Sequence, residues 1–165
     1  MVTSQKRHVE EISVHEVYNH GSSILKEFIR FPYRLYMRCS QWVPWFDKDV
    51  RQIVGRNHPY FEHSDAAFFV GRRNGETIGR IAVFHNTKYN ELHNINAASF
   101  YFFDAYNDKE VSHSLFENAS NWAKARKLDQ LIGPMLFGGV TGSGILVDGF
   151  EHRAAMTMMN YNHPY

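Results

Sequence analysis

The sequence contains a single cysteine, no long apolar run and almost no net charge. Because Cys39 has no second thiol to pair with, no internal disulfide can form, which is typical of a reducing compartment. No segment approaches the roughly 20 consecutive apolar residues that a membrane-spanning helix needs. The N-terminal residues are polar and lack the apolar stretch of a signal peptide. We therefore expect a cytoplasmic, bacterial-type protein with no membrane partner.

A strongly charged field is also lacking, since 18 Lys and Arg oppose 17 Asp and Glu. The basic residues are scattered, so we expect no nucleic-acid partner. Ten histidines are present. None forms the helical i,i+4 pair with a glutamate that is typical of a zinc enzyme, so we expect no metal.

The 165 residues are 44% hydrophobic and 15% aromatic, which indicates one folded domain over residues 1–165 with a substantial core. Apolar spacing predicts a helix over 23–36, and Pro32 should kink or split it near Arg30. A hairpin is predicted where two apolar runs flank Asn74-Gly75. Its arginines, Arg72, Arg73 and Arg80, are expected to face solvent by alternation. The other expected elements are strands over 10–17, 97–106 and 129–137 and helices over 47–55 and 109–128.

This order predicts an α/β (α+β) fold with a mixed, mostly antiparallel central sheet flanked by helices. At residues 100–119 a strand runs directly into a helix, a junction that often holds phosphate on free N–H groups. Such junctions usually carry glycine, and this one has none. Asp108 is better suited to cap the helix than to bind an anion.

The segments FIRFPYRLY, WVPWFDKDV, SFYFFDAYND, LIGPMLF, GILVDGF and MMNYNHPY, together with the hairpin, stand in one order over most of residues 25–165. In this order the chain resembles the GNAT-type acyl-CoA N-acyltransferase superfamily, and in particular an uncharacterised bacterial GNAT-like group. The resemblance implies that acetyl-CoA or another acyl-CoA lies in a cleft beside residues 97–104. It also implies that the last helix and strands of the superfamily are lacking here.

The positions that the resemblance assigns to the CoA arm are backbone groups of Phe102, Phe103, Asp104, Lys109, Glu110 and Val111. The superfamily's glycine-containing pyrophosphate loop is replaced by DAYNDKEVSH, where Asp104 and Asp108 would repel phosphate. For catalysis, Glu91 or His85 near the end of the predicted hairpin could act as general base. Tyr161 and Tyr165 lie near the end of the chain, where the superfamily often has a general-acid tyrosine, but neither takes that role by position alone.

Two further segments leave alternatives open. The glycine-rich loop 138–144 could bind an anion through its N–H groups or be a flexible loop at the mouth of the cleft. The aromatic segment 41–46, with Phe31, Tyr33 and Tyr36, could line an acceptor pocket or belong to the core.

Three functions remain open from the sequence. The chain could be a non-catalytic or ligand-binding GNAT-like domain, or an acyl-CoA-dependent N-acyltransferase for a small amine. It could also be one half of a larger architecture. Because a truncated sheet leaves an unpaired edge, we expect a homodimer that uses residues 129–150 or the C-terminal tail.

Overall fold

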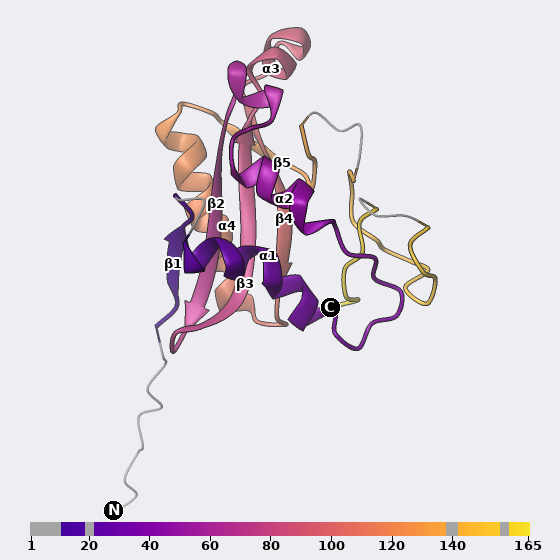
Figure 1. Cartoon of the computed structure of the whole chain (residues 1–165). Helices are drawn as coiled ribbons and strands as arrows, with labels where there is room; N and C mark the ends of the chain where they lie inside the picture. Colours follow the sequence, from indigo (N-terminus) through magenta and orange to yellow (C-terminus); the bar gives the residue numbers. More distant parts are fainter. Residues whose placement is uncertain (1–10, 19–21, 138–141, 156–158) are drawn as a thin grey trace, which may run out of the picture.

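A five-stranded sheet in the order β1-β2-β3-β4-β5 forms the centre of the molecule (Figure 1). The computed structural model describes residues 11–18, 22–137, 142–155 and 159–165. The strands are β1 (Ser13–Glu16), β2 (Asp65–Arg73), β3 (Glu76–His85), β4 (Ala97–Ala105) and β5 (Gln130–Ile132). The first four pair antiparallel and β5 pairs parallel to β4, which confirms the expected mixed, mostly antiparallel sheet.

Helices cover both faces of this sheet. α1 (Ser23–Leu35) and α2 (Asp47–Val54) pack on one face, and α4 (Lys109–Ala125) packs on the other and carries the chain across to β5. A short 3-10 helix, η1 (Pro59–Glu62), precedes β2, and α3 (Thr87–His93) connects β3 to β4. None of the helices that the structure describes is both long and apolar enough to cross a bilayer.

The predicted hairpin is confirmed. Asn74 and Gly75 have φ of 54° and 77°, and they join Arg73 to its direct partner Glu76. These positive φ values suit a type I′ turn, whose twist matches that of the two strands. The pair therefore fixes the register of β2 against β3.

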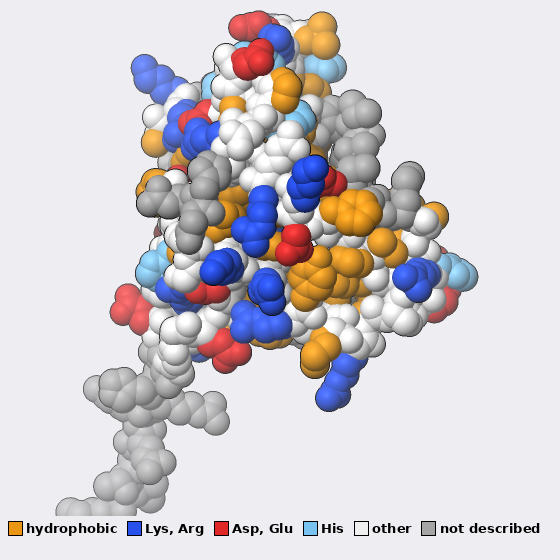
Figure 2. All heavy atoms as spheres, viewed as in Figure 1, with side chains coloured by type: hydrophobic (Ala, Val, Ile, Leu, Met, Phe, Trp, Pro, Cys, Tyr) orange, Lys and Arg blue, Asp and Glu red, His pale blue; other side chains and the backbone are white. Residues whose placement is uncertain are grey.

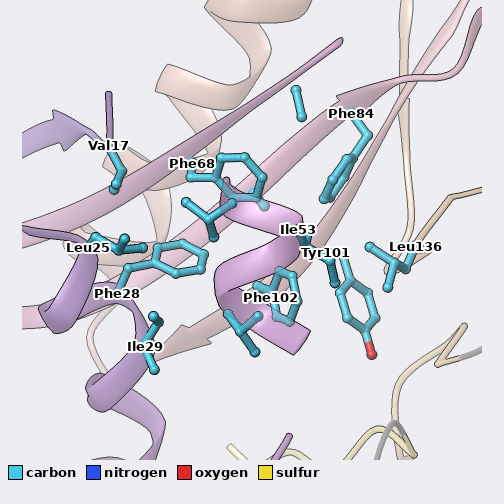
Figure 3. Close-up of a cluster of buried hydrophobic side chains, with 14 of the residues drawn as sticks. Val17, Leu25, Phe28, Ile29, Ile53, Phe68, Phe84, Tyr101, Phe102 and Leu136 are labelled. Atoms are coloured by element: carbon cyan, nitrogen blue, oxygen red, sulfur yellow. The ribbon is translucent and has the colours of Figure 1, made fainter. Parts of the chain in front are cut away.

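Two apolar cores lie on either side of the sheet. In the core under α1 and α2, Phe28 contacts Phe68 edge to face, with ring centroids 5.7 Å apart (Figure 3). In the core under α4, Val111 and Leu115 are fully buried. Because helices cover both faces, the central strands have no solvent side.

The helices that cover the sheet explain why the expectation of a solvent-facing Arg80 is wrong. Arg80 is only 5% exposed, on the face of β3 that α1 covers. Arg72 is half-buried and pairs with Glu27 of α1 at 2.6 Å. Arg73 pairs with Asp108 at the start of α4 at 2.6 Å. Successive side chains do alternate between the two faces of the strands. Because helices cover both faces, this alternation points the arginines toward helices and not toward solvent.

Pro32, which was expected to kink or split its helix, does not split it, since α1 continues through Pro32 to Leu35. Proline has no N–H, so the carbonyl of Phe28, four residues earlier, loses its usual intrahelical donor. The guanidinium of Arg80 donates to that carbonyl instead, at 2.7 Å. A buried side chain from the sheet thus satisfies the carbonyl that the proline leaves open.

Candidate functional site at the seam between β4 and β5

The two last strands separate soon after they begin to pair. β5 is hydrogen-bonded to β4 only over Ala97–Ser99, opposite Gln130–Ile132. Past this ladder the N–H of Met135 still donates to the carbonyl of Phe100 at 2.8 Å. A cavity of about 220 Å³ then lies beside residues 101–104 of β4. Its walls also include residues from α1, from the segment 42–47 and from the C-terminal segment 144–165. A slot of this kind, apolar with a few polar groups, suits a small ligand or one end of a larger one.

A bulge in β4 decides which side chains face this cavity. Arg80 pairs with Asp104 and Ala82 pairs with Tyr101, so β4 places two residues where β3 places one. Phe102 takes up the extra residue with φ of 49°. Such bulges re-aim side chains and are frequent beside active sites.

The consequence is a break in alternation. The neighbouring residues Tyr101 and Phe102 both point to the α1 side. There the centroids of their rings lie 6.2 and 5.6 Å from that of Trp45. Phe103 points to the other side and packs against Phe116 of α4. Asp104 returns to the α1 side. The bulge therefore gathers one phenol and one carboxylate beside the same slot.

Asp104 and Arg80 form a buried ion pair in the wall of the cavity. Nε and Nη2 of Arg80 both lie 2.7 Å from Oδ2 of Asp104, and the two side chains are 6% and 11% exposed. The guanidinium also lies over the rings of Phe28 and Phe102, 5.0 and 5.3 Å from their centroids. Each end of the pair is thus held by the fold within an apolar wall.

Tyr36, just past the end of α1, completes this network. Its hydroxyl donates to Oδ1 of Asp104 at 2.8 Å. Burial, and then the charge of Asp104, raise the pKa of Tyr36 above its usual range. The phenol therefore remains a hydrogen-bond donor at neutral pH, and Oδ1 keeps room for one further donor from a ligand.

The C-terminal segment closes one side of the slot. Tyr101 donates to the side-chain oxygen of Asn160 at 2.6 Å. His163 stacks between the rings of Tyr36 and Tyr165, whose hydroxyl donates to the carbonyl of Ala105 at 3.1 Å. Burial raises the pKa of Tyr101 to about 12, so this phenol also stays protonated at neutral pH.

The aromatic residues of segment 41–46 and of α1 divide between a cavity wall and the core. Trp42, Trp45 and Tyr33 line the cavity. Phe31 and Tyr36 are buried in the fold. Of the glycine-rich loop 138–144, residues 138–141 lie outside the part of the chain that the structure describes. In the described remainder, the N–H of Gly144 donates to the carbonyl of Pro134 at 2.9 Å.

The junction between β4 and α4 is arranged around Asp108. As expected, Asp108 caps α4, where Oδ1 accepts the N–H groups of Glu110 and Val111 at 2.9 and 3.4 Å. Its other oxygen accepts from Arg73, which also reaches Glu110 at 2.9 Å. Burial acts against ionisation, but Arg73 and the two N–H groups lower the pKa of Asp108 below its usual value.

A carboxylate of the chain itself thus occupies the place where the resemblance puts a diphosphate. Of the six positions that the resemblance assigned to CoA, Phe102, Phe103 and Asp104 line the slot. Lys109 lies exposed at the first position of α4. The N–H groups of Glu110 and Val111 already have an acceptor, so this junction does not fit a diphosphate as it stands.

The two residues considered as general bases lie far along the sheet from Asp104. His85 ends β3, opposite Asp65, whereas Arg80, in the middle of β3, is the partner of Asp104. Glu91 is exposed on α3, which follows β3 at that same end (Figure 1). Burial lowers the pKa of His85, which favours its neutral form. The structure does not bring either residue to the slot.

The missed functional candidate is Arg80, and Tyr36 was considered only as an aromatic residue of a pocket or of the core. Little in the sequence indicated the role of either residue. Arg80 binds a carbonyl that Pro32 leaves without a donor, and the bulge in β4 has no local sequence pattern. Within the described residues, no group of three or more side chains is arranged to bind a metal ion.

Sheet order, the crossover through α4 and the open seam define the fold as that of the GNAT-type acyl-CoA N-acyltransferases. A GNAT-family acetyltransferase from Staphylococcus aureus Mu50 matches with a TM-score of 0.52 at 17% identity, over 76% of this chain and 74% of that chain. A tandem GNAT protein from the clavulanic acid biosynthesis pathway matches with a TM-score of 0.57 at 12% identity, over 76% of this chain and 38% of that chain. Such identities establish the fold alone.

Two curated proteins are similar in sequence. Protein YghO of Escherichia coli (strain K12) is 28% identical over 141 residues, which is 86% of this chain and 36% of that protein. A bacterial ceramide synthase of Caulobacter vibrioides (strain NA1000 / CB15N) is 28% identical over 143 residues, which is 86% of this chain and 37% of that protein. The chain therefore spans little more than a third of the length of these relatives. No family model matches the sequence.

Proposed function

We propose that this GNAT-like domain transfers an acyl group from a thioester donor such as acyl-CoA to the amino group of a long-chain amino alcohol. The observation that carries the proposal is the buried carboxylate of Asp104, which the bulge of β4 and the guanidinium of Arg80 hold in the wall of the seam. Bulge, slot and ion pair occur at one place, which is how binding sites are commonly built.

The similar ceramide synthase supports the class of acceptor. A ceramide is an amide of a long-chain amino alcohol with a fatty acid, so the name of that protein implies N-acylation. The walls of the slot fit such chains, since aromatic and aliphatic side chains surround the few polar groups. Acetyl-CoA, our first expectation for the donor, would be the shortest member of the donor class.

In the proposed reaction, the amine nitrogen attacks the thioester carbonyl carbon, the new C–N bond forms and the C–S bond breaks. Asp104 accepts the proton that the amine loses, and that proton passes to the departing sulfur, so that the products are an amide and a free thiol. Oδ1 of Asp104 takes this role, because Oδ2 already accepts two bonds from Arg80. Tyr36 holds Oδ1 in place at 2.8 Å. A positioned base of this kind typically accelerates a reaction by a factor of about 10²–10⁴.

The test is an assay of the chain with sphinganine and acyl-CoAs of two to sixteen carbons, in which amide is measured by mass spectrometry and free thiol by a colour reaction. We expect amide formation with the wild type and a loss of about 10²–10⁴ in Asp104→Asn. Asp129→Asn is the matched control, since Asp129 is exposed and contributes only its backbone N–H to a hydrogen bond. The proposal is wrong if no acyl-CoA yields amide, or if both variants keep full activity while thermal melts show them folded.

A second candidate function is a non-catalytic, ligand-binding domain. The observation in its favour is Asp108, which occupies the N–H groups that would hold a diphosphate. A non-catalytic domain would bind an apolar ligand in the slot and show no heat with CoA in calorimetric titration. The expected homodimer also remains a proposal, and light scattering across a concentration series tests it.

A further inference from the structure

Cationic side chains form a stripe on the outer face of α1. Lys26, Arg30 and Arg34 recur every fourth residue and are exposed, and Arg38 follows at the same interval in the turn after the helix. Residues four apart lie on one face of a helix, so the first three form a single row. Figure 2 shows Lys and Arg side chains gathered on this side of the molecule, beside a group of hydrophobic side chains.

The stripe is not balanced by ion pairs. Among the described residues, no carboxylate lies within ion-pair distance of Lys26, Arg30 or Arg38. Arg34 donates only to a backbone carbonyl, at 3.4 Å. Like charges four residues apart destabilise a helix, so the row has a cost in the isolated protein.

Three carboxylates border the stripe, and two of them have partners. Glu27 is bound by Arg72 and by the hydroxyl of Thr77. Asp47 accepts the hydroxyl of Tyr33 at 2.9 Å. Glu76 stands exposed at the start of β3. The bordering negative charge is therefore mostly satisfied within the fold, whereas the cations of the stripe face outward.

Apolar side chains are exposed next to these cations. Met37 is 74% and Phe46 66% exposed, and Tyr33 is also exposed. With Trp45 and the cations of α1, Phe46 and Tyr33 line an open concavity of about 1050 Å³. Tyr33 and Trp45 also line the seam cavity, so the two hollows are neighbours.

We propose that this face docks on a membrane surface that contains anionic lipid. Cations in a row are attracted to acidic headgroups, while adjacent aromatic and aliphatic side chains enter the interfacial layer. The near-neutral net charge, from which we expected no membrane partner, is an average over all faces and does not describe this one. Docking in this orientation would bring the neighbouring slot close to lipid-borne molecules.

The experiment measures sedimentation of the full chain with vesicles of phosphatidylcholine containing 30% phosphatidylglycerol, and with phosphatidylcholine alone. We expect binding to the anionic vesicles that weakens as salt rises, because salt screens exposed charges. Lys26→Gln/Arg30→Gln should weaken it about thirtyfold, since each cation near an acidic bilayer contributes roughly fivefold. Lys88→Gln/Lys124→Gln removes the same charge from α3 and α4 and should leave binding unchanged.

Fluorescence adds the orientation. Trp42 and Trp45 stand beside the stripe, and Trp122 lies on α4 under Arg126. Brominated lipid should quench a larger fraction of the emission in a Trp122→Phe variant than in the wild type, because Trp122 lies on α4, on the sheet face opposite α1. Absence of binding to anionic vesicles, equal loss in both charge variants, or displacement by inorganic phosphate at constant ionic strength would each overturn the proposal. Because no catalysis is measured, failure here is distinct from failure of acyl transfer.

Discussion

Replacement of Arg80 by methionine should lower the free energy of unfolding by about 3–5 kcal/mol, because it removes one partner of a buried ion pair. Asp104 would lose both bonds to the guanidinium and keep only the hydroxyl of Tyr36. The carbonyl of Phe28, which Pro32 cannot serve, would lose its donor as well. A domain of this size has roughly 5–15 kcal/mol in all, so the variant should still fold.

The measurement is urea unfolding followed by circular dichroism. Arg56→Met is the matched control, since the side chain of Arg56 is 52% exposed where it pairs with Asp65, and such pairs contribute about 0–1 kcal/mol. The double variant Arg80→Met/Asp104→Leu should regain much of the loss, because no charge is then left buried alone. A cost below about 1 kcal/mol for Arg80→Met would show that water reaches the pair and would refute the reasoning.

Three shorter predictions concern other parts of the fold. Asp108→Asn keeps a capping side chain but removes a charge, so calorimetry should show CoA binding about tenfold tighter, whereas unchanged affinity would place the diphosphate elsewhere. Burial alone would raise the pKa of Asp65, but the hydrogen bond from Arg126 lowers that pKa below its usual value. The ionised Asp65 therefore stabilises the fold at neutral pH, and this stabilisation is lost as pH falls. Asp65→Asn should therefore show a shallower fall in melting temperature below about pH 5, and a slope equal to that of the wild type would contradict this. A Cβ on Gly133 would lie 2.6 Å from the carbonyl oxygen of Phe100, so Gly133→Ala should cost more than about 1 kcal/mol in urea unfolding, and no loss would show that the seam can shift.

The elements that the sequence predicted well depend on local signals. Asn74-Gly75 specifies its turn through two positive φ values, and Asp108 specifies the start of α4 through its side-chain cap. Each requires only neighbours in the chain. The hairpin and the long helix were therefore predictable without knowledge of the other layer.

The candidate site was harder to predict because it depends on contacts between distant elements. Alternation along β3 could not show that α1 covers the face on which Arg80 stands. Pro32 was expected to kink or split its helix, since nothing local shows that a guanidinium from the sheet will bind the carbonyl that the proline leaves open. The bulge at Phe102 likewise needs two strands to define it.

The start of α4 distinguishes the two candidate functions. Asp108 stabilises the helix by about 1 kcal/mol as a cap, and its pairing with Arg73 places a cation beside the same N–H groups. In the proposed acyl transfer, a donor whose diphosphate binds at this helix would displace this carboxylate and gain Arg73 as a partner. Under this proposal, donor binding and capping compete for the N–H groups of Glu110 and Val111. If the wild type acylates amines yet binds free CoA weakly, the acyl chain in the slot, rather than the diphosphate, supplies most of the affinity for the donor.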